Sequence, residues 1–267
     1  MSGATRLWTK LEQKKTATST ISLSPGSALM VTLAEAGFDC TVVDLMFTET
    51  TWRDAADMVR AGRERGMTML IRVQAEPWAV QRNGQIIVDA GRALSIGAEG
   101  VVFSVSDRWE VEGVLKVAGE WHRNLSAIPF TRETFDAHVK SLEESTLMVP
   151  LIESPASFDN MEEIVSTPGL KVVMIGTTDT AVSLGHGVNS DHPEVWDMVD
   201  KLRKLCDRYG VAMWANTAMG FSTLPLMTDR AEKLREHGVD IILYQTPELL
   251  LQMAGKHVVD ALAKVSE

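Results

Sequence analysis

Cysteines and long apolar runs are both scarce in this sequence of 267 residues. Only two cysteines occur, Cys40 and Cys206, and they lie far apart with no CxxC spacing. This pattern indicates neither a disulfide framework nor a thiolate zinc site. No stretch approaches the roughly 18 apolar residues of a membrane span, and residues 1–15 contain no apolar signal-peptide core. We therefore expect a soluble, cytoplasmic protein that is not secreted.

Positive charge is also in short supply, with 26 Lys and Arg residues against 36 Asp and Glu residues. The resulting formal charge of −10 would repel phosphate backbones and anionic membranes, so neither nucleic acid nor a membrane is an expected partner. A dinucleotide fingerprint is missing as well. Gly185, His186 and Gly187 follow no predicted strand and lack the GxGxxG spacing, which excludes a nicotinamide site.

What the sequence does contain is a regular alternation of short β-branched runs and longer helical patterns. This alternation is typical of parallel βαβ units. The predicted strands are residues 18–23, 41–44, 67–73, 100–103, 147–153, 172–175, 211–216 and 240–244. Eight such units fit the size of a (β/α)₈ TIM barrel. No linker or low-complexity tract divides the chain, so we predict one α/β barrel domain over residues 1–267.

Capping residues in the sequence predict where several helices begin and end. Ser24-Pro25 and Ser154-Pro155 each place a capping hydroxyl before a proline, which is favoured in the first helical turn. Gly37 and Gly66 are expected to end the helices that precede them. Residues 107–146 show the weakest periodicity, and we expect a helix followed by an irregular loop there.

Polar residues at the carboxyl ends of the predicted strands are the candidates for chemistry, because active sites of such barrels lie on that rim. Asp44, Arg72, Glu153 and Asp179 occupy these positions. Glu153 and Asp179 end consecutive strands and could hold a hard divalent cation such as magnesium or manganese, or else cap helices or pair with arginines. Arg72 could bind a substrate oxyanion, or could be a buried arginine paired with a neighbouring acid.

Two further features have a functional and a structural interpretation. Gly176-Thr177-Thr178 could present backbone N–H groups to a carboxylate at a helix start, or could simply form a tight turn. Trp78 and Trp214, near the ends of the third and seventh strands, could line an aromatic substrate pocket. Packing in the core or at an interface is the other interpretation.

These residues lie in segments that resemble the HpcH/HpaI aldolase family, the class II metal-dependent pyruvate aldolases. The resemblance covers nearly the whole chain, and its motifs occur in order at consistent spacing. They are AGFDCTVVD at 36–44, IRV at 71–73, IGAEGV at 96–101, LIES at 151–154, IGTTD at 175–179 with SLG at 183–185, and HPEV at 192–195.

The resemblance implies a reaction at a bound metal ion. Glu153 and Asp179 would ligate Mg²⁺, Mn²⁺ or Co²⁺, and a 2-oxo acid would chelate the ion while it is cleaved to, or joined with, an aldehyde. Arg72 would stabilise the enolate oxygen, and backbone amides around Thr177, Thr178 and Asp179 would hold the carboxylate. The family usually forms a hexamer with exchanged terminal helices. Residues 247–265 are apolar on two sides, which agrees with a subunit contact.

The sequence departs from the family where the acid–base histidine is expected. The usual Asp-x-Glu-His is Asp44-Leu45-Met46-Phe47 here, and a phenyl ring cannot transfer a proton. Leu151 replaces a frequent glutamine, and Thr177 a frequent proline. The glycine- and arginine-rich loop after the fourth strand is replaced by residues 121–124 and those that follow.

Three interpretations of the altered site remain open. The protein could be an aldolase that obtains its proton through Glu49, His122 or water, with Phe47 and Met46 shaping a more apolar pocket. It could catalyse another metal–enolate reaction, such as decarboxylation or retro-Claisen cleavage. It could be a weakly active or inactive homologue that binds a metabolite. Glu49 could equally well favour the start of the next helix through its charge.

Overall fold

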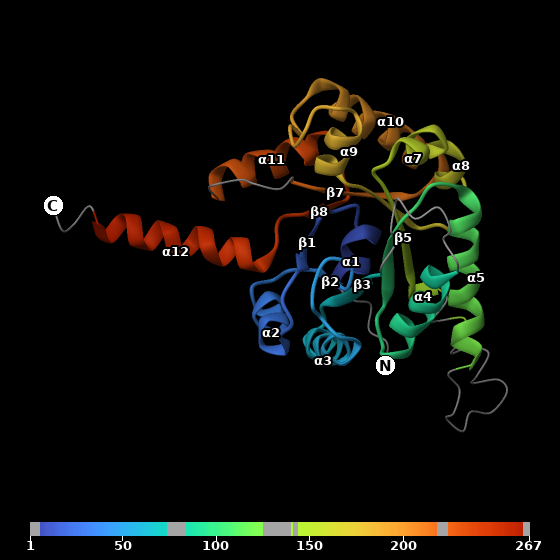
Figure 1. The fold of residues 1–267 in the computed structure, drawn as a ribbon, viewed down its shortest axis with the longest axis horizontal. Helices are drawn as coiled ribbons and strands as arrows, with labels where there is room; N and C mark the ends of the chain where they lie inside the picture. Colours follow the sequence, from blue (N-terminus) through green and yellow to red (C-terminus); the bar gives the residue numbers. More distant parts are fainter. Residues whose placement is uncertain (1–5, 74–83, 125–139, 141–143, 218–223, 264–267) are drawn as a thin grey trace.

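Eight parallel strands form a closed barrel in this computed structural model, which describes residues 6–73, 84–124, 140, 144–217 and 224–263 (Figure 1). Neighbouring strands pair in chain order, and β8 pairs with β1 to close the ring. The strands are β1 Ala17–Ser22, β2 Cys40–Asp44, β3 Thr68–Arg72, β4 Gly100–Ser104, β5 Leu147–Ile152, β6 Val172–Ile175, β7 Ala212–Asn216 and β8 Ile241–Leu243. The predicted (β/α)₈ barrel is confirmed, and no strand end differs from its predicted position by more than one residue.

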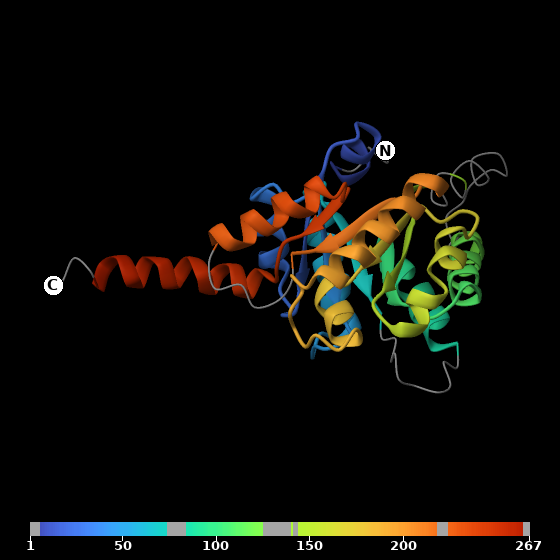
Figure 2. The same cartoon turned by 90° about the horizontal axis from the view of Figure 1, so that it is seen from above.

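Helices follow the strands and surround the barrel, while the last helix projects away from it (Figures 1 and 2). Those of the first half are α1 Arg6–Glu12, α2 Ser27–Glu35, α3 Trp52–Arg63, α4 Gln85–Ser95 and α5 Arg108–Asn124. Those of the second half are α7 Pro155–Asp159, α8 Met161–Val165, α9 Thr177–Ser183, α10 Pro193–Tyr209, α11 Leu224–Glu236 and α12 Pro247–Ala263. No helix among these described segments is long and apolar enough to cross a membrane.

Alternating strand side chains divide the core into two layers. Successive residues of a strand point to opposite faces, so every second residue enters the barrel. Val42, Leu70, Val102 and their counterparts on other strands form the interior cluster, and the intervening residues pack under the helices. Leu7 of α1 is fully buried within the interior cluster. The N-terminal helix therefore packs against the inside of the barrel.

The predicted helix boundaries are partly correct. Ser154 caps α7 by accepting a hydrogen bond from the Ser157 amide, with Pro155 in the first turn, as predicted. Gly37 and Gly66 have positive φ angles of 96° and 74° just after α2 and α3, as expected for residues that end helices. The start predicted at Ser24-Pro25 is wrong, because α2 begins at Ser27 after an N-cap glycine. The Ser24 amide instead donates to Glu248 of α12.

The segment between β4 and β5 contains the predicted helix, α5. This helix extends to Asn124, so residues 121–124 form its last turn and not the beginning of a loop. The irregular loop that we expected after it falls on residues 125–139 and 141–143, which lie outside the described part of the chain.

Candidate active site

Polar side chains form the last layer at the carboxyl-terminal mouth of the barrel. They continue the two-residue alternation of the apolar interior: Val42 leads to Asp44, Leu70 to Arg72, and Val102 to Ser104. On the following strands the same step leads to Glu153, Gly176 and Asn216. The strand periodicity thus brings an acid, a cation and a neutral hydrogen-bonding group from different strands to one mouth.

Arg72 and Asp44 form an ion pair between neighbouring strands. The two residues are register partners in the β2–β3 pairing, and Arg72 Nε donates to Asp44 Oδ1 at 2.8 Å. Asp44 is 0% exposed and also accepts hydrogen bonds from the amides of Met46, at 2.9 Å, and Phe47, at 3.2 Å. With three N–H donors on its two oxygens, Asp44 is suited to fix Arg72 and the turn after β2. In this geometry Asp44 positions Arg72, and its predicted place in the catalytic machinery stays a prediction.

Glu153 and Asp179 lie close together, as the sequence predicts. A Cβ atom built on Gly176 would lie 2.6 Å from Glu153 Oε2 and 3.6 Å from Asp179 Oδ2, so both carboxylates reach the same point. Ser104 Oγ donates to the other oxygen of Glu153 at 2.9 Å. A side chain at position 176 would therefore have to displace the Glu153 carboxylate.

The two carboxylates share a desolvated environment that resists negative charge. Burial raises the pKa of Glu153 to about 7, and repulsion from Asp179 adds to the rise, while Ser104 and Arg72 oppose it. Burial likewise raises the pKa of Asp179, against the lowering effect of Arg72 and of the residue's own backbone N–H. The Arg72 charge thus acts on both acids, which places all three groups in one electrostatic site.

Part of the backbone at the start of α9 already donates hydrogen bonds within the protein. The Thr177 amide donates to Asn216 Oδ1 at 2.7 Å, and the Thr177 hydroxyl also lies 3.0 Å from that oxygen. The Thr177 amide is therefore paired within the protein, and its contact with a substrate carboxylate stays a prediction. Thr178 is mostly buried in the first turn of the same helix. Ser183, at the end of α9, donates to the backbone carbonyl of Glu153 at 2.7 Å and links this helix to the β5 end.

Trp214 and Glu49 occupy different surroundings from those expected of substrate contacts. Trp214 is 0% exposed in the barrel interior, and its indole N–H donates to Ser19 Oγ at 3.0 Å. It packs in the core, and the pocket interpretation is corrected, because side chains enclose the indole on all sides. Glu49 is exposed, two residues before Thr51, which caps α3. Trp78 lies outside the described residues, as does the His122 side chain.

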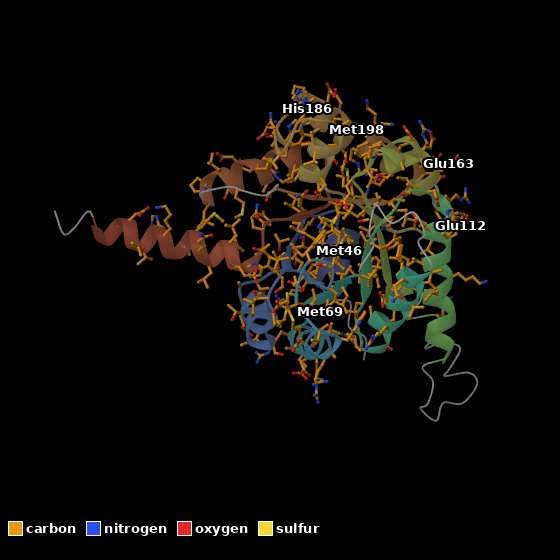
Figure 3. All side chains as sticks on the ribbon, viewed as in Figure 1. Met46, Met69, Glu112, Glu163, His186 and Met198 are labelled. Atoms are coloured by element: carbon orange, nitrogen blue, oxygen red, sulfur yellow. The ribbon has the colours of Figure 1, made fainter. Side chains whose placement is uncertain are left out.

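Phe47 is the most exposed large apolar side chain of the turn after β2. It is 64% exposed, and the centroid of its ring lies 5.1 Å from the guanidinium carbon of Arg72. This is the range of a cation–π contact. Met46 precedes it, is half-buried, and lies near the middle of the view in Figure 3. The turn therefore presents apolar surface beside the Arg72 charge.

Sequence reasoning did not single out Ser104, Asn216 or Ser183. The first two follow the inward positions Val102 and Trp214 by two residues, which is a signal that strand periodicity carries. The contact of Ser183 with the Glu153 carbonyl depends on how α9 packs across β5 and has no local signature.

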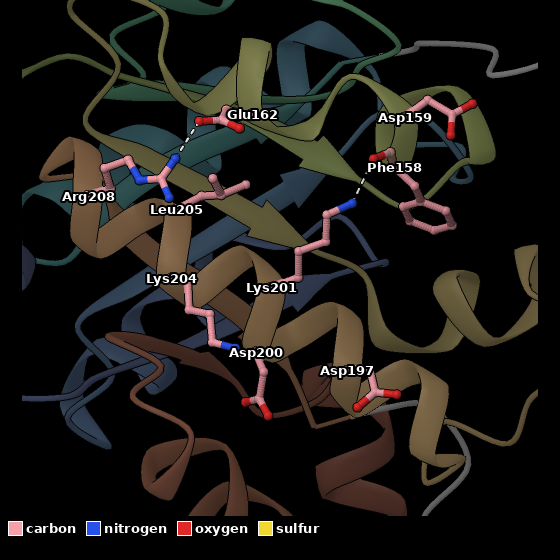
Figure 4. A pocket seen from close by; sticks show the side chains of 9 residues that line it. All are labelled: Phe158, Asp159, Glu162, Asp197, Asp200, Lys201, Lys204, Leu205 and Arg208. Atoms are coloured by element: carbon pink, nitrogen blue, oxygen red, sulfur yellow. Dashed lines mark hydrogen bonds and ion pairs between the residues drawn. The ribbon is translucent and has the colours of Figure 1, made fainter.

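A separate open hollow of about 530 Å³ lies in the outer helical layer, between α7, α8 and α10 (Figure 4). Two of the three cations that line it have partners, since Arg208 pairs with Glu162 at 2.6 Å and Lys201 donates to the Phe158 carbonyl at 3.4 Å. The remaining lining residues carry charges of both signs. The hollow therefore lacks a set of groups that converge on one ligand.

Known proteins resemble this chain over most of its length. The family model described as HpcH/HpaI aldolase/citrate lyase matches residues 24–247. A 2-dehydro-3,6-dideoxy-6-sulfogluconate aldolase of Pseudomonas putida is 21% identical over 90% of this chain and 94% of its own. A hydroxypyruvate/pyruvate aldolase of Paraburkholderia phytofirmans is 25% identical over 71% and 75%.

Solved structures agree on the fold. The crystal structure of an HpcH/HpaI aldolase from Desulfitobacterium hafniense superposes with a TM-score of 0.76 at 21% identity, covering 97% of each chain. The family match and the relatives named as aldolases together indicate an enzyme of the aldolase or lyase type. The chain belongs to the HpcH/HpaI aldolase/citrate lyase family.

Proposed function

We propose that this protein is a divalent-metal-dependent carbon–carbon lyase that acts on a 2-oxo acid through its enolate. The observation that carries the proposal is the convergence of Glu153 and Asp179 beside Arg72. Family membership supports a reaction of the aldolase or lyase type, and relatives named as pyruvate aldolases support the choice of a 2-oxo acid.

The carboxylate pair fits a divalent cation. Two buried acids that repel each other are unfavourable as a pair of anions, and a cation between them would remove that repulsion. The Glu153 and Asp179 carboxylates would hold Mg²⁺, Mn²⁺ or Co²⁺, since oxygen donors suit these ions. The bound ion would supply Lewis-acid stabilisation of negative charge on the substrate oxygens.

The protein's own groups would orient the substrate and stabilise its charge. Cleavage of the carbon–carbon bond leaves the bonding electron pair on the 2-oxo acid as its enolate. Asp44 binds the Nε edge of Arg72 and so leaves the outer guanidinium nitrogens to donate to the enolate oxygen. Ser104 would keep Glu153 in place by donating to its second oxygen.

The apolar turn at Met46 and Phe47 supports an acceptor that is itself apolar. The Phe47 ring is exposed beside Arg72, where an incoming aldehyde would meet a phenyl surface and not an imidazole. Proton transfer would then fall to water or to the exposed Glu49.

A second candidate function is a metal–enolate reaction without a hydroxyl proton to remove, such as decarboxylation or retro-Claisen cleavage. The observation that favours it is the phenyl ring of Phe47 beside Arg72, where the family usually has a histidine that carries a proton. Arg72 and the two carboxylates are nevertheless close together, so a reaction that needs no such histidine fits the site. The family description includes citrate lyase, which supports the same alternative. A weakly active or inactive metabolite-binding protein is the third candidate.

We further propose that α12 contacts another copy of this chain, with a hexamer as the expected assembly. The helix projects from the barrel (Figures 1 and 2) and exposes Leu251 at 75%, Val258 at 55% and Val259 at 65%. Burial of such side chains is favourable in a subunit interface. Light scattering on the intact chain should give an oligomer, and the Leu251→Asp variant should give smaller species.

Proton–deuterium exchange of the pyruvate methyl group, followed by NMR in heavy water, tests the function directly. We expect exchange with manganese or magnesium and none with chelator, because enolate formation labilises the methyl protons. Glu153→Gln and Asp179→Asn should abolish the exchange, and Glu163→Gln, an exposed acid of α8, should preserve it. Metal binding without exchange would contradict a pyruvate enolate and favour another 2-oxo acid or a non-aldol reaction.

A further inference from the structure

Two histidines and a glutamate gather at the junction of α9 and α10, apart from the carboxylate pair. His186 Nε2 lies 3.1 Å from Glu194 Oε2, and the His186 and His192 rings stack with centroids 3.4 Å apart. One ligand atom from each of the three residues lies within 4.8 Å of the others. His186 is found at the periphery of the molecule in Figure 3, on the side of α10 residue Met198.

Hydrogen bonds fix the backbone of the loop that carries the three residues. The His186 amide donates to the Ala181 carbonyl of α9 at 2.8 Å. His192 is the N-cap of α10, and its Nδ1 accepts from the Glu194 amide at 3.3 Å. Between them, nearly buried Arg230 donates to the Ser190 carbonyl at 2.7 Å. The loop that carries the ligands is therefore anchored to α9, α10 and α11.

The side chains nevertheless retain room to adjust. His186 is 22% exposed and Glu194 is 58% exposed. A metal ion lies in the plane of an imidazole that binds it, so the stacked rings must turn apart to share one ion. Exposed side chains change rotamer on a fast timescale, and such a turn does not require the backbone to move.

We propose that His186, His192 and Glu194 form a second metal site that takes a borderline transition-metal ion such as Zn²⁺. Two imidazole nitrogens and one carboxylate are a common zinc donor set, with water in the fourth position. Neutral imidazole is a good donor near neutral pH. This donor set differs from the all-oxygen pair at Glu153 and Asp179, so the two sites should prefer different ions.

Occupancy of the second site would join the loop after α9 to the first turn of α10. Helix α9 carries Asp179, and Ser183 of the same helix holds the Glu153 carbonyl. The ion would thus brace the scaffold of the carboxylate pair from outside. Its measurable consequence is a rise in the thermal midpoint with Zn²⁺, because an ion that binds only the folded state stabilises it.

Zinc titration of the full, metal-stripped chain by calorimetry tests the proposal. The Glu153→Gln/Asp179→Asn background removes the carboxylate pair, and about one equivalent of Zn²⁺ should still bind. His186→Gln and His192→Asn should each abolish that binding, and asparagine preserves an N-cap at position 192. His257→Gln, an exposed histidine of α12, is the matched control and should bind as before.

Co²⁺ absorption gives an independent readout, since imidazole ligation should produce visible bands that His186→Gln removes. Circular dichroism should be unchanged in all variants, because the side chains lie at the surface. Absence of zinc binding in the double-variant background would overturn the proposal, and so would zinc binding that survives both histidine substitutions. Neither result depends on catalysis, so the second site and the proposed lyase function fail independently.

Discussion

Replacing Glu153 with glutamine should stabilise the metal-free protein at alkaline pH. The amide has nearly the shape of the carboxyl group, and its oxygen can still accept the Ser104 hydrogen bond. What the substitution removes is a negative charge buried beside Asp179. The barrel is thus expected to gain stability by losing a residue that the proposed function requires.

The magnitude follows from the pKa of Glu153, which rises from 4.5 to about 7 on folding. Below pH 4.5 both folded and unfolded chains hold the proton, so the carboxyl group has little effect on stability there. Between pH 4.5 and 7 the folded chain keeps a proton that the unfolded chain releases, and stability falls as the pH rises. Above pH 7 the full cost to folding stability is present, about 3.5 kcal/mol at about 1.4 kcal/mol per pKa unit.

Urea and thermal unfolding with chelator at pH 5 and pH 8 would measure the effect. The Glu153→Gln midpoint should exceed that of the parent by roughly 5 °C at pH 8 and by much less at pH 5. Mn²⁺ at about a thousandfold excess over Kd should reverse the order, because the ion stabilises only the parent, by about 4.1 kcal/mol. The exposed Glu163→Gln is the control. An equal gain at both pH values, or a loss at pH 8, would refute the reasoning.

Three other substitutions probe the mouth of the barrel. Gly176→Ala should weaken Mn²⁺ binding at least about tenfold in calorimetry, since the new Cβ would lie 2.6 Å from Glu153 Oε2; unchanged affinity would contradict the crowding. Asp44→Asn should lower kcat about tenfold or more with little change in metal affinity, because Arg72 loses its charged partner; equal kinetics would show that Arg72 is held without it. Phe47→His should raise pyruvate-aldolase turnover in a coupled assay, and no gain would indicate a substrate different in kind.

The strands and the acids at their ends could be predicted because both have local signals. Each strand is a short β-branched or apolar run, and Glu153 follows such a run directly. The position of Asp179 was readable for the same reason, as β6 ends four residues earlier. Chain order then placed both acids on one rim, because parallel strands of a barrel share a carboxyl end.

Contacts between strands could not be predicted from the sequence in the same way. The Arg72–Asp44 pair depends on the β2–β3 register, and both sequence interpretations of Arg72 turn out to be compatible. Thr177 binds Asn216 across β6 and β7, which only the three-dimensional arrangement reveals. Trp214 lies near a strand end, but its inward direction and its hydrogen bond to Ser19 make it part of the core.

Along β4 the inward-facing side chain changes from apolar Val102 to polar Ser104, and neighbouring strands show the same change. Stability therefore depends on the lower residues of each strand, and the chemistry of the site depends on the uppermost one. Lower residues interlock with others in the sealed interior, where a change of volume is felt by every neighbour. The uppermost residue borders open space on one side, so it can be exchanged with less disturbance beneath it. The chemistry of such a barrel can therefore change at one rim position at a time while the core beneath it is kept.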